Sequence, residues 1–163
     1  MLIANISAHA DAQNAASAAE AARTQVVAAA ETPAPPPEKR IEVILETQRL
    51  IGWEGDQKVF EFAVTTGQEG QPTLSGEFEV LDKEENPYSY AWAFDMPYWL
   101  GIYQVGEFEN GFHGLPVDSD GEELWGDALG VYPATHGCIV LARADARHLF
   151  EWADVGTKVD IHD

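Results

Sequence analysis

The single cysteine of this 163-residue chain, Cys138, directly follows His136 and Gly137, and a second histidine–glycine pair, His113 and Gly114, lies upstream. A thiol within reach of an imidazole is what acyl transfer through a thioester requires, because the base takes the thiol proton and the thiolate attacks a carbonyl carbon. A glycine beside the nucleophile leaves backbone N–H groups free to stabilise an oxyanion. These residues therefore predict a cysteine nucleophile at position 138.

The residue types alone also allow other interpretations of Cys138. A free cysteine commonly behaves as a small buried hydrophobe, and Cys138 leads into the apolar run 139–141. His113, His136 and Cys138 could instead be three zinc ligands, since these residue types suit zinc. A spacing of two residues between His136 and Cys138 is not a usual ligand pair and no fourth ligand is obvious, so we expect no metal.

A pattern in four segments extends the motif to the rest of the chain. In order they are Thr66-Gly67 with Pro72-Thr73 and Gly76-Glu77-Phe78, then His113-Gly114, then Thr135-His136-Gly137-Cys138-Ile139, and finally Gly156-Thr157-Lys158-Val159-Asp160-Ile161. Together they resemble the catalytic domain of the L,D-transpeptidases, also called the YkuD domain. Short strings recur by chance, whereas four segments in one order are a strong signal. The resemblance covers residues 40–163.

The resemblance implies a catalytic role for each residue of the motif. Cys138 would be the nucleophile, and His113 would be the general base that takes its proton. His136 would shape the site rather than act as the base. The backbone amides of Gly137 and Cys138 would bind the oxyanion. Gly114 would allow the backbone to approach the substrate closely.

Three further residues are candidates for contact with the substrate. Thr135 would orient the site or form a local hydrogen bond, although a turn residue that satisfies its own backbone is an equal alternative. Tyr98 and Trp99 could line a groove for a peptide, together with Met96 and Trp125. Aromatic residues of this kind are more often part of the core.

The chain departs from the family pattern at two places. Many members carry Arg or Asn two residues after the cysteine, where it can hold the site or a substrate carboxylate, whereas this chain has Val140. The nearest basic residue in sequence is Arg143. Residues 118–123 lengthen the segment between His113 and Cys138, and we expect them to form a surface loop near the cleft.

Hydrophobic periodicity predicts a mainly β fold. Apolar residues alternate with polar ones in several short runs, which indicates strands with one buried face. Residues 145–153 switch to helical spacing, with Gly156 beyond the end. With the resemblance, this predicts a YkuD-like β-sandwich with one helix near the C-terminus. The predicted strands are 41–45, 60–64, 77–80, 88–94 and 159–161, with a turn at 54–56.

Residues 1–39 differ in composition from the rest of the chain. The stretch 8–30 is rich in alanine and favours a marginal helix, which the proline-rich run 32–37 then stops. We therefore predict an Ala-rich and Pro-rich spacer over 1–39 and a catalytic domain over 40–163.

The net charge of the protein limits which partners it can bind. With 28 acidic and 9 basic residues the formal charge is −19, so nucleic acid and anionic membranes would be repelled. No run approaches 18 consecutive apolar residues, so we expect no transmembrane helix. No basic segment precedes the apolar opening 1–4, so no secretory signal is evident, although the resemblance implies an extracytoplasmic enzyme.

The resemblance implies an L,D-transpeptidase that acts on peptidoglycan stem peptides and needs no cofactor, and we expect a monomer. Cys138 would attack the third residue of a tetrapeptide stem, release the terminal D-alanine and form a thioester, which an amine of a second stem would displace to give a 3-3 cross-link. If water were the acceptor, the protein would be an L,D-carboxypeptidase or amidase. A weakly active wall-binding module, with Val140 marking lost activity, is the third interpretation.

Overall fold

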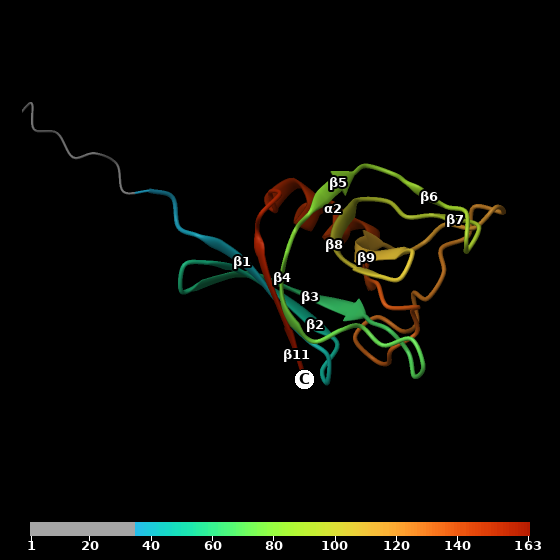
Figure 1. Cartoon of the computed structure of the whole chain (residues 1–163), viewed down its shortest axis with the longest axis horizontal. Helices are drawn as coiled ribbons and strands as arrows, with labels where there is room; N and C mark the ends of the chain where they lie inside the picture. Colours follow the sequence, from blue (N-terminus) through green and yellow to red (C-terminus); the bar gives the residue numbers. More distant parts are fainter. Residues whose placement is uncertain (1–34) are drawn as a thin grey trace, which may run out of the picture. The chain divides into compact units, whose positions relative to one another are not determined.

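The computed structural model describes residues 35–163, shown with the rest of the chain as a trace in Figure 1. The prediction of an alanine-rich helix at 8–30 lies outside the described residues, as does most of the predicted spacer over 1–39. Both stay predictions. From Lys39 onward the chain forms the β structure that the alternating sequence pattern indicates.

Within this part of the chain, nine strands form a single sheet in the order β4-β11-β1-β2-β3-β10-β9-β8-β5, and β6 pairs separately with β7. Figure 1 shows β1, β2, β4 and β11 toward one side and β5, β8 and β9 toward the other. The strands are β1 (Lys39–Ile44), β2 (Arg49–Glu54), β3 (Gln57–Thr65), β4 (Gly76–Glu79), β5 (Asp82–Glu84), β6 (Tyr88–Ser89), β7 (Phe94–Asp95), β8 (Trp99–Val105), β9 (Phe108–Gly114), β10 (Ile139–Leu141) and β11 (Lys158–His162).

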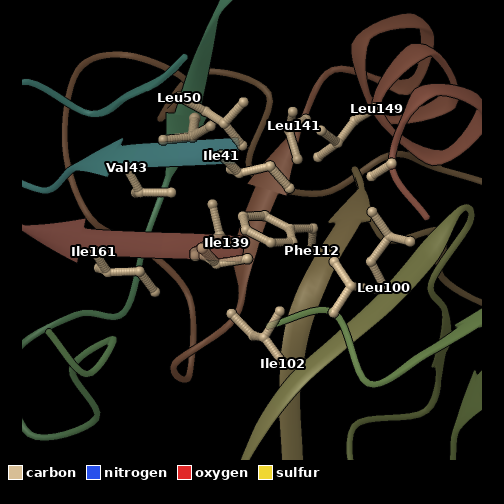
Figure 2. Packing of buried hydrophobic residues seen from close by; sticks show 14 of the residues in the cluster. Ile41, Val43, Leu50, Leu100, Ile102, Phe112, Ile139, Leu141, Leu149 and Ile161 are labelled. Carbon is tan, nitrogen blue, oxygen red and sulfur yellow. The ribbon is translucent and has the colours of Figure 1, made fainter. Parts of the chain in front are cut away.

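The sheet curls so that its two halves bury their apolar faces in one core. Ile41 on β1 and Ile161 on β11 belong to the same buried cluster as Phe112 on β9 and Ile139 on β10, and Figure 2 shows these side chains packed together. Each is almost completely buried, which stabilises the fold by about 1.5–3 kcal/mol per side chain. The predicted mainly β, sandwich-like fold is confirmed.

One helix in the described chain, α2 (Arg143–Trp152), follows β10 and agrees with the prediction over 145–153. Its buried residues Ala146 and Leu149 face the sheet. Lys83 on β5 donates hydrogen bonds from Nζ to the carbonyl oxygens of Phe150 and Ala153 at the end of the helix. This cation satisfies carbonyl groups that have no partner within the helix and lies at the negative end of its dipole. In residues 35–163 no helix is long and apolar enough to cross a membrane.

The prediction of one aromatic strand over 88–94 is wrong. Only Tyr88–Ser89 and Phe94–Asp95 are extended, and they pair with each other as a short hairpin. The backbone N–H of Ala93 donates to the Ser89 carbonyl at 2.7 Å, and Ala93 has a positive φ of 56°. A turn of this kind reverses the chain, so the aromatic residues between the two strands lie at the tip of a hairpin instead of along one strand.

We expect Lys83→Met to lower the free energy of unfolding by about 1–2 kcal/mol, because the last carbonyl groups of α2 lose a charged donor while the aliphatic stem is kept. Urea denaturation followed by circular dichroism measures this change. Lys58→Met is the matched control, since Lys58 is exposed and pairs only with Glu61, and we expect a change below about 0.5 kcal/mol. Equal effects of the two substitutions would contradict the capping role.

Candidate active site

A cavity of about 310 Å³ opens where segments far apart in the sequence meet. Its walls are mostly apolar. Of the residues predicted from the sequence, Cys138, His113, His136, Gly137 and Thr135 line it together. The lining residues fall within 70–74, 89–96, 105–113, 125 and 135–138.

The pairing of β10 with β9 positions the Cys138 thiol and the His113 imidazole. The two strands are parallel, with Ile139 opposite Phe112 and Val140 opposite His113. Cys138 directly precedes β10, and its thiol receives a hydrogen bond from the backbone of Gly111 on β9. The thiol and the imidazole therefore reach the same cavity from neighbouring strands.

His113 is buried and neutral, with a defined tautomer. Its side chain is 1% exposed, and Nδ1 lies 2.7 Å from the carbonyl oxygen of Gly114. A carbonyl oxygen can only accept, so Nδ1 carries the hydrogen and Nε2 holds the free lone pair. Burial lowers the pKa of His113 to about 4, although the Gly114 hydrogen bond acts to raise it. At neutral pH the imidazole can therefore act as a base through Nε2.

The thiol of Cys138 is held in its neutral form. Burial raises the pKa of Cys138 to about 11; the hydrogen bond from Gly111 lowers it, and the nearby carboxylate of Glu109 raises it further. Sγ lies 3.9 Å from Oδ1 of Asn110, which accepts its weak hydrogen bond. The site thus holds a neutral thiol and a neutral imidazole rather than an ion pair, so a reaction in which the sulfur attacked a carbonyl carbon would have to remove the thiol proton.

Hydrogen bonds hold the motif loop rigidly before the cysteine. Thr135 is fully buried, and its hydroxyl donates to the Cys138 carbonyl at 2.6 Å and accepts from the Gly137 N–H at 3.2 Å. The Gly137 carbonyl accepts hydrogen bonds from Thr73 Oγ1 at 2.9 Å and from the Tyr103 hydroxyl at 3.2 Å. Thr135 therefore acts locally on the loop, and the Gly137 amide already has a partner.

His136 forms one wall of the cavity through aromatic contacts. Its ring stacks on Trp92, with centroids 3.7 Å apart and planes 18° from parallel, and it meets Trp125 edge-on at 5.9 Å. Burial lowers the pKa of His136, and its Nδ1 is buried without a hydrogen-bond partner in the part of the chain described. Trp92 was missed from the sequence because 88–94 was expected to be one strand, whereas the hairpin carries it to this wall.

Three predicted residues lie outside the lining. Trp99 is 6% exposed, stacks behind His113 at 5.9 Å and donates from Nε1 to Asp82 Oδ1 at 3.1 Å. Tyr98 turns toward Phe150 of α2, with ring centroids 5.9 Å apart. The Cα of Gly114 packs beneath Pro97 and α2. The structure thus gives these three residues packing roles outside the cavity lining.

Among residues 35–163, those that line the cavity include no lysine or arginine. Val140, which replaces the polar residue of many family members, is fully buried. Arg143 does not compensate, because it points to Glu123 at 3.6 Å on an exposed surface. The one carboxyl group in the lining belongs to Glu109, whose pKa is raised by burial and then by the neighbouring Asp82.

Expectations for the loop at 118–123 and for a metal site can also be compared with the structure. Residues 118–123 form an exposed loop in which Asp118 Oδ1 accepts from the backbone N–H groups of Asp120 and Glu122. Across residues 35–163, no three His, Cys, Asp or Glu side chains are arranged to hold a metal ion.

Comparison with known proteins agrees with this fold. The profile of the YkuD family, the L,D-transpeptidase catalytic domain, matches residues 38–161. A protein of Bacillus subtilis (strain 168) named "Putative L,D-transpeptidase YciB" is 29% identical over 127 residues, which are 74% of this chain and 64% of that protein. An L,D-transpeptidase from Mycobacterium smegmatis has a TM-score of 0.67 at 15% identity, over 78% of this chain and 59% of that one. LdtMt1, solved in complex with imipenem, has a TM-score of 0.67 at 14% identity, over 77% and 59%.

The match over most of the described residues defines the class of domain that the fold represents. It belongs to the YkuD family of L,D-transpeptidase catalytic domains. The two solved structures share its fold, and the chain spans about three fifths of the length of these relatives.

The raised pKa of the thiol predicts how Cys138 reacts with iodoacetamide. Because only the thiolate is alkylated, the rate should rise about tenfold per pH unit between pH 7 and 9.5, without a plateau. Mass spectrometry of the single cysteine measures the rate, and His113→Gln should keep the same slope because the imidazole is already neutral. A plateau reached below pH 8 would indicate a thiolate–imidazolium pair and contradict the neutral resting state.

The lowered pKa of His113 predicts acid sensitivity of the fold. The unfolded histidine takes up a proton near pH 6.5, whereas the folded one does so near pH 4. Its contribution is therefore fully present above pH 6.5 and is lost as the pH falls toward 4, by about 3 kcal/mol. Urea denaturation from pH 7.5 to 4 measures this loss. Over the same pH range, the free energy of unfolding of His113→Gln should fall by about 3 kcal/mol less than that of the wild type. An unchanged pH dependence in this variant would contradict a buried neutral imidazole.

Proposed function

We propose that this chain is an L,D-transpeptidase that cross-links peptidoglycan stem peptides through a thioester at Cys138. The observation that carries the proposal is that the Cys138 thiol and the His113 imidazole line one cavity within a YkuD fold. A second observation supports it: the tautomer of His113 leaves Nε2 free to accept a proton.

In the proposed acylation step, His113 Nε2 takes the thiol proton while Sγ bonds to the carbonyl carbon of the third residue of a tetrapeptide stem. The electron pair of the C=O bond moves onto oxygen. When the pair returns, the bond to the nitrogen of the terminal D-alanine breaks, and His113 gives its proton to that nitrogen. Cys138 is left as a thioester.

In the second step, an amine of another stem attacks the thioester. His113 takes the amine proton, the C–S bond breaks, and the sulfur recovers a proton to regenerate the thiol. Glu109 supports this acceptor, because its carboxyl group, in a lining whose described residues include no lysine or arginine, favours the entry of a cationic amine over an anionic group. The ammonium loses one proton to water before its neutral form attacks, and the second amine proton is the one that His113 takes. Peptidoglycan lies outside the cytoplasm, so we expect the enzyme to act there.

The apolar wall formed by Trp92 and His136 supports a peptide substrate. Stacked rings give a large contact area at small entropic cost, and the loop bearing Cys138 is fixed against them by the hydrogen bonds of Thr135. A stem peptide lying along this wall would present its carbonyl carbon to Sγ.

Incubation with purified tetrapeptide muropeptides tests the proposal. We expect cross-linked dimers from the wild type, none from Cys138→Ala, and a rate about 10²- to 10⁴-fold lower from His113→Ala, because general base catalysis is lost. Liquid chromatography with mass spectrometry measures the products. His162→Ala is the matched control, since His162 on β11 bonds to Glu42 away from the cavity, and it should retain the wild-type rate.

The products also separate the alternatives. Shortened monomers without dimers would identify water as the acceptor and an L,D-carboxypeptidase. Wild-type protein that binds muropeptides but leaves them unchanged would identify a wall-binding module. Either result, or full activity of Cys138→Ala, would overturn the proposed cross-linking function.

A further inference from the structure

Asn110 is a buried polar residue beside the nucleophile to which neither the motif nor the family resemblance gives a role. It lies on β9, three residues before His113, is 6% exposed and lines the cavity. Its Oδ1 is 3.9 Å from Cys138 Sγ. An asparagine in this position brings a neutral amide, with two N–H donors, to the atom that attacks the substrate.

The amide nitrogen of Asn110 is unpaired within the described part of the chain. Nδ2 donates no hydrogen bond within residues 35–163, and the one buried side-chain atom there that lacks a partner is Nδ1 of His136. Nδ2 is therefore not a fully buried atom, and Asn110 borders the cavity. A buried polar side chain normally satisfies its hydrogen-bonding groups, so a donor kept free at this place is available to a ligand.

Close packing against Gly137 holds the amide in position. Gly137 has a φ of +121°, and a Cβ at this position would lie 2.4 Å from Asn110 Oδ1. A side chain at 137 would therefore be strained by the backbone and would also displace the amide. The glycine of the motif thus makes room for Asn110 directly beside Cys138.

The site needs a further donor for a developing negative charge. The N–H of Gly137, one of the two predicted oxyanion donors, already donates to Thr135 Oγ1 at 3.2 Å. The described residues of the lining include no lysine or arginine, and the carboxyl group of Glu109 disfavours negative charge nearby. In such a site a fixed neutral donor makes a large contribution, because the charge forms away from bulk water.

From this geometry we propose that Asn110 is a catalytic residue that donates from Nδ2 to the oxyanion formed when Cys138 Sγ attacks a carbonyl carbon. The inference rests on the proposed thioester chemistry. In the step concerned, the C–S bond forms, the carbonyl electron pair moves to oxygen, and the thiol proton goes to His113. Asn110 stabilises the charged oxygen and is released when the carbonyl is reformed.

Two reactions of the same thiol test this role. Acylation of Cys138 by imipenem passes through an oxyanion: the C–S bond forms, the C–N bond of the lactam ring breaks, and the nitrogen receives the thiol proton. Alkylation by iodoacetamide displaces iodide and forms no oxyanion. We expect Asn110→Ala to slow acylation about 100-fold, the usual effect of losing one oxyanion donor, while alkylation changes by less than about threefold. Mass spectrometry measures both rates at one pH.

Two further variants make the comparison robust. Asn110→Asp keeps the shape of the side chain but removes the N–H donors, and the ratio of acylation to alkylation should fall as it does in Asn110→Ala. Asn86→Ala is the matched control, because Asn86 is exposed and bonds to Asp95 outside the cavity, and its ratio should equal that of the wild type. Thermal unfolding checks that each variant is folded.

If acylation and alkylation change by the same factor in both Asn110 variants, Asn110 serves only to pack the loop and the inference is overturned. Wild-type protein that forms dimers from muropeptides while the variants keep the wild-type ratio would overturn the role of Asn110 alone. Wild-type protein that forms no adduct at Cys138 with either imipenem or muropeptides would overturn the proposed function itself.

Discussion

The backbone pairing of β10 with β9 brings the Cys138 thiol and the His113 imidazole to one cavity, and the other features of the candidate site depend on it. Parallel strands in register place Val140 opposite His113, so Cys138 enters the sheet beside Gly111. Both strands are buried in the middle of the sheet, with β3 on one side and β8 on the other. Because parallel strands need a long connection, the 24 residues between β9 and β10 are free to build the rim of the cavity.

Burial of this strand pair also sets the electrostatics of the site. Removal of water opposes the charged form of each group, which raises the pKa of Cys138 and lowers that of His113. At neutral pH the proton therefore stays on sulfur. In the proposed acylation, charge would separate only when a substrate carbonyl accepts the attack and donors surround the oxygen. Such a nucleophile would depend on the groups around the reacting carbonyl more than on a preformed thiolate.

The parts of the fold that follow from local sequence were predictable. Alternation of apolar and polar residues indicated β1, β4 and β11, and helical spacing indicated α2, because each pattern reflects one face packed on a core. The structure of the segment 88–94 was not predictable, because its aromatic residues suit a strand while the turn at Ala93 depends on the contacts of the hairpin. Strands β8 and β9 carry a bulge opposite Asn110 and Gly111, which no alternation signals.

For the site, the sequence by itself determined which chemistry is available. One cysteine and two histidine–glycine pairs predicted thiol chemistry, because this chemistry belongs to residue types and spacing. Four segments in one order carried the resemblance to the YkuD family, which the family profile bears out. The tertiary structure alone decided that Trp92, Glu109 and Asn110 share the cavity with Cys138, and that Tyr98 and Trp99 lie outside it. Burial, and the neighbours that supply or withhold hydrogen bonds, come from segments distant in the sequence, so the protonation states and the contacts of the reacting groups arise only when the sheet closes.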